Sequence, residues 1–362
     1  CNEFTINMNF LHIVFWISFS AILYTSVLYI IVLKIIKKNH YKKDSDYLPT
    51  VSLIICTYNE EKNVAVKLEN TFTLDYPLEK LQVILADDGS TDKTLEIAKQ
   101  FEFVERLKLS RGGKTRAQND AVKIAQNEIL VFSDANNIYK KNALKKLVRN
   151  FADKRVGVVC GELQYSNKKS EENYYWKYEV AIKKAESKNG WLLGANGSIY
   201  AVRKNAFVPL PEDSISDQLE PIKVYGNGLD IIYEPEAIAI EDAPNDVLKR
   251  KRRIILRSLV TMKYVFTLLN PFKKRSVFIP YISHKLIRWF LPLFLFLCFL
   301  SSIYLAEDSN IFRMILILQV MFYISGIFLS GVRYIIKVIV ASALAIIDWI
   351  LGKKQTTWTV VR

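Results

Sequence analysis

Residues 81–92 read LQVILADDGSTD and decide the fold of this chain. Residues 81–86 form a short apolar run typical of a buried strand, and residues 94–101 carry apolar side chains at helical spacing. The turn between them holds two adjacent carboxylates, Asp87 and Asp88. Ligands of open α/β sheets bind outside the carboxyl ends of the strands, so this pair indicates a ligand site. The alternative is a helix cap, a role open also to Thr91 and Asp92.

Strand-like and helical patterns alternate on both sides of this stretch. Further apolar runs occupy residues 51–56, 106–109, 129–133 and 156–160, and helical patterns fit between them, for example at 114–125 and 142–151. This alternation predicts an α/β domain with a largely parallel sheet. No repeat, low-complexity tract or glycine- and proline-rich linker interrupts the sequence here, so we expect one domain over residues 48–269.

Polar motifs follow three of the predicted strands. Residues 57–60 come after the first run, Asp87 and Asp88 after the second, and Asp134 after residues 129–133. Parallel strands present their carboxyl ends at one edge of a sheet, whereas chance would scatter the acids over both edges. The clustering therefore favours a shared cleft over helix capping.

Hydrophobic residues are concentrated near the two ends of the chain. Residues 11–33 are 23 positions without a charge, enough to cross a hydrocarbon core of about 30 Å. The run is too long for a cleavable signal peptide, which is the alternative. Residues 286–305 and 311–330 are two further predicted spans. Residues 334–352 carry Lys337 and Asp348, so we expect this segment to lie at the interface or re-enter, with a full crossing as the alternative.

Basic residues set the expected orientation in the membrane. Lysines follow the first span in a juxtamembrane linker at 34–47, and lysines and arginine precede the second in an interfacial linker at 270–285. The positive-inside rule then places the middle domain in the cytoplasm, with residues 1–10 an extracytoplasmic tail and 353–362 a cytoplasmic one. Contact with anionic lipids explains most of the net charge of +14, and no nucleic-acid partner is expected.

The cysteines and histidines carry no recognisable motif. The four cysteines lack CxxC spacing, so neither a zinc site nor a disulfide framework is indicated, and we expect buried packing positions. The histidines, His12, His40 and His284, lie in or beside the predicted membrane flanks without an evident partner. We assign them no chemistry from the sequence.

The ordered set of motifs resembles a known family. The residues are Thr57-Tyr58-Asn59-Glu60, Asp87 to Asp92, Gly113-Lys114, Asp134-Ala135-Asn136, Gly194-Ala195-Asn196-Gly197 and Ser216-Asp217. In this order they resemble the membrane-bound inverting glycosyltransferases of family 2, such as cellulose, hyaluronan and chitin synthases and bacterial exopolysaccharide transferases. The resemblance implies a Rossmann-like GT-A domain in the cytoplasm, joined to transmembrane helices in a multi-pass protein of the cell membrane, expected to be a bacterial inner membrane.

The resemblance also implies site residues. Asp217 is the expected general base, with a helix cap as its alternative. Asp134 is expected to hold Mg²⁺ or Mn²⁺, with Asn136 standing where the family has a second Asp. The donor nucleotide would be bound by Thr57, Tyr58, Glu60, Asp87, Asp88, Lys114 and Arg253. The acceptor side would be lined by Trp191, Gly194, Ala195, Asn196 and Gly197, although a core position is equally open for Trp191.

The implied function is transfer of a sugar from a nucleotide-sugar donor, expected to be UDP-linked, to a growing polysaccharide or lipid-linked saccharide. The mechanism would be a metal-dependent inverting displacement, and partners from a polysaccharide assembly system are expected. Only Arg253 matches the QxxRW motif of the synthases, which leaves processive synthesis open. A polyprenyl-phosphate glycosyltransferase and a non-catalytic membrane scaffold remain as alternatives.

Overall fold

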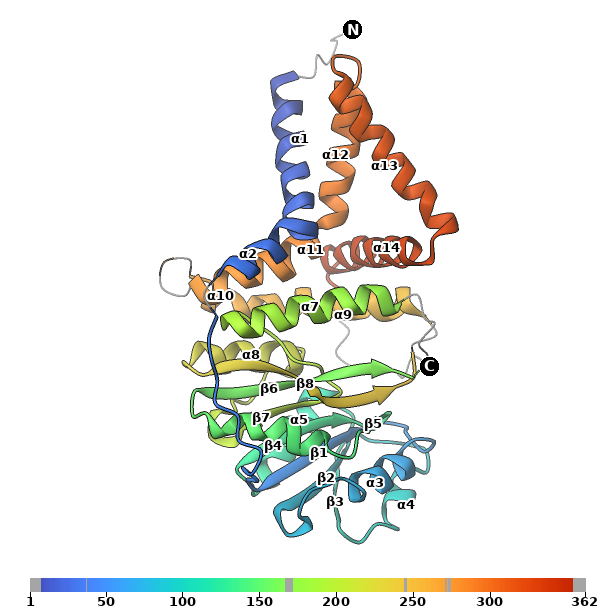
Figure 1. Ribbon diagram of the computed structural model, residues 1–362. Coiled ribbons are helices and arrows are strands. Elements are labelled where there is room, and N and C mark those ends of the chain that lie inside the picture. The colour runs from blue at the N-terminus through green and yellow to red at the C-terminus, as the bar shows by residue number, and fades with distance from the viewer. Residues whose placement is uncertain are drawn as a thin grey trace.

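The computed structural model describes residues 8–36, 38–166, 172–243, 246–270, 272 and 275–353. Residues 1–7 and 354–362, which make up most of the expected tails at 1–10 and 353–362, lie outside this part of the chain. An α/β domain occupies one end of the molecule, and an upright group of helices occupies the other (Figure 1). A layer of helices lies between the two (Figure 1).

One eight-stranded sheet forms the centre of the α/β domain, in the order β3-β2-β1-β4-β7-β6-β8-β5. Strands β3, β2, β1 and β4 are parallel, and β7 runs antiparallel to both β4 and β6. The parallel sheet is thus confirmed for this half, and the other half is mixed. The strands are β1 (Val51–Thr57), β2 (Leu81–Asp87), β3 (Val104–Lys108), β4 (Ile129–Asp134), β5 (Asn137–Tyr139), β6 (Val156–Tyr165), β7 (Tyr200–Arg203) and β8 (Asp230–Glu241).

The core explains why β1 is apolar along its length. Leu53 and Ile55 pack into one hydrophobic cluster, and Ile54 and Cys56 pack into another. Successive side chains of a strand point to opposite faces, and every residue of β1 is buried, so both faces of the sheet are covered. The helices of this domain are α3 (Val64–Phe72), α4 (Thr94–Ala98), α5 (Lys114–Ile124), α6 (Ala143–Val148), α7 (Glu172–Asn189), α8 (Ser216–Gly226) and α9 (Val247–Val265).

Strand register brings the sequence motifs together. Thr57 pairs with Asp87, and Cys56 pairs with Asp134, so β1, β2 and β4 end side by side. The predicted convergence of the three polar strand ends is therefore present. Cys56, Cys160 and Cys298 are buried and free, as expected for packing residues.

Three helical stretches are long and apolar enough to cross a membrane, within the part of the chain described above. They are Met8–Ile35, which contains α1 (Met8–Leu23) and α2 (Tyr29–Ile35), then α13 (Asn310–Phe328) and α14 (Ser330–Ile350). A bent pair gives a fourth if counted as one span: residues Val277–Trp289 meet α12 (Leu291–Leu305) at 62°. The apolar stretch expected at 286–305 is thus divided, because the chain turns at Phe290 and a new helix begins at Leu291, with Pro292 in its first turn.

Helix α14 lies across the molecule, between the upright helices α1, α12 and α13 and the α/β domain (Figure 1). Arg252 of α9 donates a hydrogen bond of 2.6 Å from Nε to Oδ2 of Asp348 in α14. Ser342 of α14 donates to the backbone oxygen of Trp289 in α11 (Ile287–Trp289). Asp348, one of the two charged residues noted in this segment of the sequence, is therefore paired with α9 of the α/β domain.

Candidate active site

Lys114 and Asp134 form the centre of the candidate site. Lys114 begins α5, and its ammonium forms an ion pair with the carboxylate of Asp134 at the end of β4. The same ammonium donates to the backbone oxygen of Gly197 at 3.2 Å. Burial opposes the charge of Lys114, but the carboxylates of Asp134 and Asp217 outweigh it and raise the pKa of Lys114 above its ordinary value.

Asp217 reaches the same point from the first turn of α8. The backbone N–H of Ala195 donates to the Asp217 carbonyl at 2.8 Å, which fixes the segment at 194–197 against the helix start. A Cβ added to Gly197 would lie 2.9 Å from Oδ2 of Asp217 and 3.2 Å from Nζ of Lys114. The missing side chain at position 197 therefore lets an acidic and a basic group approach the same backbone.

A cavity of about 300 Å³ opens over these groups. We call it the charged cavity, because six basic side chains line it and only two carboxylates do. The carboxylates are Asp134 and Asp217; the basic residues are Lys114, Lys183, Arg250, Lys251, Arg253 and Arg257. Burial, and then the neighbouring Arg257, lower the pKa of Arg253. An excess of half-buried positive charge of this kind suits a diphosphate.

Asp88 organises the loop that leads to Lys114. Its carboxylate accepts hydrogen bonds from the backbone N–H groups of Gly112 at 2.7 Å and Gly113 at 2.9 Å, and from Nη1 of Arg111 at 3.0 Å. Gly113 has a φ of 96°, a conformation that favours glycine. The guanidinium of Arg111 lies 3.1 Å from the ring centroid of Tyr58. The carboxyl ends of β1 and β2 thus form one polar surface together with the loop before α5.

Asp87 has a different set of partners. It is fully buried, and its carboxylate accepts from Oγ1 of Thr57 at 3.0 Å and from the backbone N–H of Ser90 at 2.9 Å. The capping that the sequence left open belongs to Asp92, which accepts from the backbone N–H of Thr94 at 3.0 Å. Asp87 therefore shapes the turn, and Asp92 serves the start of α4.

The predicted site residues divide into three groups. Lys114, Asp134, Ala195, Asn196, Gly197, Asp217 and Arg253 line the charged cavity. Thr57, Tyr58, Glu60, Asp87 and Asp88 lie at the adjoining ends of β1 and β2 and do not line it. Glu60 is buried and accepts from Nδ2 of Asn63 at 2.6 Å. Asn136 is exposed. Trp191 packs against the cluster of Tyr29, Leu33 and Ile182, and Gly194 lies outside the charged cavity.

Several residues of the site were missed from the sequence. Arg111 directly precedes Gly112 and Gly113, and this position beside the predicted Gly113-Lys114 motif could have marked it as a site residue. Arg250 and Arg257 lie on α9 three residues before and four residues after the predicted Arg253, which places the three on one helix face. That periodicity is visible in the sequence. His284 was assigned no chemistry, yet its ring nitrogens meet Glu186 at 2.7 Å and Glu179 at 3.3 Å. No sequence signal joins positions so far apart.

The side-chain oxygens of Asp134 and Asn136 would suit a metal ion that binds together with the donor. Within the described part of the chain, no group of three or more His, Cys, Asp or Glu side chains is placed to hold a metal. Mg²⁺ is commonly held by one or two carboxylates together with substrate phosphates and water. Asp134, with the amide of Asn136 two residues later, would supply that limited protein share. The site does not provide an all-protein metal cage.

Comparisons with known proteins show what this chain is similar to. Residues 52–207 match the family model for glycosyl transferase family 2. The chain is 33% identical over 181 residues to beta-monoglucosyldiacylglycerol synthase of Nostoc sp., covering 47% of this chain and 38% of that protein. It is 29% identical over 209 residues to poly-beta-1,6-N-acetyl-D-glucosamine synthase of Staphylococcus aureus, covering 53% and 50%. The matched region thus spans half or less of these curated relatives.

A solved structure shares the fold over nearly the whole chain. It is the mannosyltransferase PcManGT from Pyrobaculum calidifontis in complex with GDP-Man and Mn²⁺, with a TM-score of 0.74 and 21% sequence identity. The likeness covers 95% of this chain and 100% of that one. The expected GT-A fold is confirmed, and the motifs lie within the matched family region or directly after it. The chain therefore carries a glycosyltransferase domain of family 2.

Proposed function

We propose that this protein transfers a sugar from a nucleotide-sugar donor, expected to be UDP-linked, to a growing polysaccharide or lipid-linked saccharide. The reaction is a metal-dependent inverting displacement at the cytoplasmic face of a cell membrane. The observation that carries the proposal is the approach of Lys114 and Asp217 to Gly197, with Asp134 ion-paired to Lys114, in a cavity lined by six basic side chains.

Asp217 would act as the general base. Its carboxylate accepts the proton of the acceptor hydroxyl while that oxygen forms a bond to the anomeric carbon. The bond from the anomeric carbon to the diphosphate breaks on the opposite side, which inverts the configuration. Lys114, Arg253 and Arg257 lie in the same cavity and stabilise the charge of the departing diphosphate. Bound through Asp134 and Asn136, a divalent ion would supply further neutralisation of that charge.

The nucleotide end of the donor would lie beyond Lys114, toward the ends of β1 and β2. Tyr58 and Arg111 offer a ring and a stacked guanidinium, and Asp88 fixes the loop between them and Lys114. The resemblance to family 2 enzymes favours UDP. The solved mannosyltransferase binds GDP-Man, so a donor screen must contain both nucleotides.

The membrane part of the proposal rests on the apolar helices. We take α1 with α2, α12 and α13 as crossing the membrane, and α14 as lying at the cytoplasmic interface. Asp348 of α14 is paired with Arg252 of α9, which keeps its charge on the side of the α/β domain. Lysines of the linker after α2 would face anionic lipids, as would basic residues before α12.

The test is Asp217→Asn in the detergent-solubilised protein, screened with UDP- and GDP-sugars and with metal added or removed. The variant keeps the shape of the side chain but removes the base, so transfer should fall by about 10²- to 10⁴-fold. Nucleotide binding should stay within about twofold of the unaltered protein, because the charged contacts to the diphosphate remain. Asp213→Asn is the matched control, since Asp213 pairs with Lys263 outside the charged cavity.

Three outcomes contradict parts of the proposal. Equal loss of binding and transfer in Asp217→Asn refutes the base assignment. An acid-labile phosphodiester product identifies a polyprenyl-phosphate transferase instead. Absence of turnover with every donor in the unaltered protein supports a non-catalytic scaffold.

A further inference from the structure

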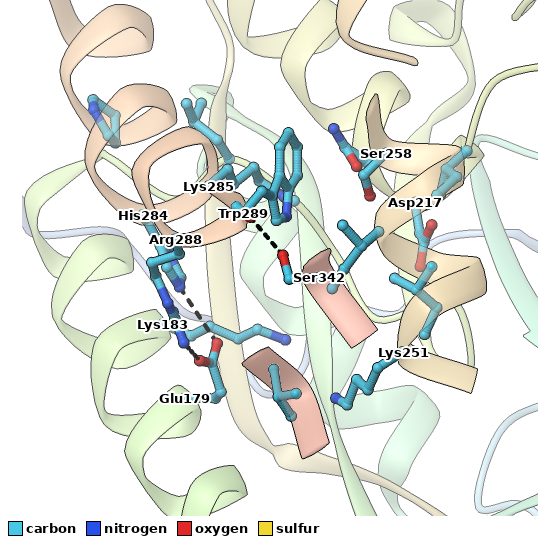
Figure 2. Close-up of a pocket in the computed structure, with 18 of the residues that line it drawn as sticks. Glu179, Lys183, Asp217, Lys251, Ser258, His284, Lys285, Arg288, Trp289 and Ser342 are labelled. Carbon is cyan, nitrogen blue, oxygen red and sulfur yellow. Dashed lines mark hydrogen bonds and ion pairs between the residues drawn. The ribbon is translucent and has the colours of Figure 1, made fainter. Parts of the chain in front are cut away.

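A second cavity of about 320 Å³ lies between the α/β domain and the membrane helices. We call it the interface cavity. Its walls come from α7, α9, α11 and α14 and the segment before α11, and Figure 2 shows Asp217, Lys285 and Trp289 around it. Asp217, Lys183 and Lys251 line this cavity and also the charged cavity. The two cavities therefore meet at the proposed base.

One wall of the interface cavity is apolar. Ile254 and Ile255 come from α9, Trp289 from α11, and Val338 and Ile339 from α14. Leu291, the first residue of the membrane helix α12, also lines it. The apolar wall of the cavity is therefore continuous with the start of the membrane helix α12. A hydrocarbon chain would be shielded from water along it, at roughly 0.8 kcal/mol for each buried methylene group.

The opposite wall is polar and largely neutralised. Arg288 and His284 pair with Glu179, and Glu186 accepts from the Tyr29 hydroxyl at 2.7 Å and meets Nδ1 of His284 at 2.7 Å. Four lysine or arginine side chains line this cavity against three carboxylates, whereas the charged cavity has six against two. The interface cavity therefore favours a neutral polar head over a phosphate.

Lys285 brings a hydrogen-bond donor to the junction of the two cavities. A Cβ added to Gly194 would lie 3.2 Å from Nζ of Lys285 and 3.8 Å from the backbone oxygen of Asp217. An acceptor head group at this junction would meet an ammonium donor and, through the shared lining, the carboxylate of Asp217. That pairing suits a hydroxyl that must lose a proton, which a phosphate acceptor need not do.

We propose that the interface cavity is the acceptor site, and that the acceptor is a membrane lipid with a free hydroxyl group. The inference rests on the proposed transfer of a sugar from a nucleotide-sugar donor, and it puts a lipid hydroxyl in the place of the saccharide acceptor. The lipid hydroxyl lies at Asp217, and its hydrocarbon chain lies against α9, α11 and α14. The hydroxyl oxygen bonds to the anomeric carbon, its proton passes to Asp217, and the electron pair of the broken bond leaves with the nucleotide diphosphate.

The location of the apolar wall supports this choice of acceptor. A water-soluble saccharide would gain nothing from Val338, Ile339 and Ile255, whereas a lipid needs a surface of this kind. Because the cavity reaches Leu291 at the start of α12, a lipid can enter it without leaving the apolar layer. The glycosidic bond then forms at the membrane surface, beside the donor in the charged cavity.

The test places a large side chain on the apolar wall, so that it fills part of the interface cavity. Val338→Trp places a large ring in the interface cavity, and Val340→Trp is the matched control because Val340 is on the same helix, 41% exposed and outside the lining. The full-length protein is placed in phosphatidylcholine vesicles containing dioleoylglycerol, a neutral lipid with one hydroxyl. We expect transfer to dioleoylglycerol to fall at least about tenfold in Val338→Trp and to be unchanged in Val340→Trp. Hydrolysis of the donor and nucleotide binding should be equal in both variants.

A second variant covers the case in which Val338→Trp fails to fold. Ile335→Trp changes a lining residue that is 39% exposed, so the ring enters from the rim of the same wall. Equal transfer to dioleoylglycerol by the lining variants and Val340→Trp overturns the lipid site, as does transfer only to polyprenyl phosphate or to a soluble oligosaccharide in parallel vesicles. Failure of the unaltered protein to bind or hydrolyse any donor overturns the proposed function instead.

Discussion

Substituting Gly197 by alanine tests the geometry of the site without changing any group that does chemistry. The added Cβ would lie 2.9 Å from Oδ2 of Asp217, 3.2 Å from Nζ of Lys114 and 3.4 Å from Cγ of Asp217. Ordinary van der Waals contacts between carbon atoms lie near 3.5–4.0 Å. The carboxylate of Asp217 must therefore move by roughly half an ångström, and the ammonium of Lys114 by roughly a few tenths.

The expected loss is in turnover and not in stability. The crowded atoms are the ends of side chains, which can turn away at small cost to the fold. A displacement of about 1 Å in a reacting group can cost about 10²-fold in rate. A shift of roughly half that size should therefore lower kcat by about tenfold. The unfolding midpoint should change little.

The assay compares kcat and KM for the donor in Gly197→Ala with those in Gly331→Ala. Gly331 lies on α14, and an added Cβ there meets nothing within 4 Å. Both variants make the same chemical change, so only the crowding at Asp217 and Lys114 differs. Thermal unfolding in detergent with bound nucleotide checks that each variant is folded.

An unchanged kcat in Gly197→Ala would refute the reasoning, because it would mean that the close approach of Asp217 and Lys114 at this backbone is not required. An equal loss in Gly331→Ala would also refute it. A loss confined to Gly197→Ala, with donor binding retained, is the expected result.

Two further predictions concern the metal and the buried acid of α8. Asp134→Ala should weaken Mn²⁺-dependent nucleotide binding by about tenfold or more, since a contact to a charged group is worth about 1.5–3 kcal/mol; calorimetric titration with and without Mn²⁺ measures it, and equal metal dependence in the variant contradicts the ligand role. Burial raises the pKa of Glu220 to about 8 from its ordinary 4.5, although Tyr200 donates to it at 3.2 Å. The folded state then holds a proton that the unfolded state loses above about pH 4.5, so the stability from Glu220 is complete below that pH and is lost as the pH rises through 8. Glu220→Gln should abolish this loss, worth at most about 5 kcal/mol, and identical unfolding midpoints against pH in both proteins would contradict it.

Buried strands were predicted closely because their signal is local. The run at 51–56 became β1 with one further residue, and 129–133 became β4 with one further residue. A strand covered on both faces must be apolar throughout, and its end is marked by the first polar residues. The helical pattern at 142–151 was less accurate, since α6 ends at Val148 and a short 3₁₀ helix follows.

The antiparallel part of the sheet and the junction with the membrane helices were not predicted. Strand β7 has four residues and β5 has three, too short for periodicity to appear. Their pairing depends on neighbours from distant parts of the chain. The interface cavity depends in the same way on helices that begin at Glu172, Val247 and Ser330.

The sequence by itself determined the α/β domain, the apolar helices and the polar strand ends, because each is encoded by a pattern within a few neighbouring residues. The grouping of the polar strand ends follows too, because parallel strands present their carboxyl ends at the same edge of a sheet. Only the tertiary structure decided that Asp217 meets Gly197, that Arg257 joins Arg253 in the charged cavity, and that His284 pairs with Glu186. Those contacts bring together residues on separate elements, and packing of the whole chain fixes them.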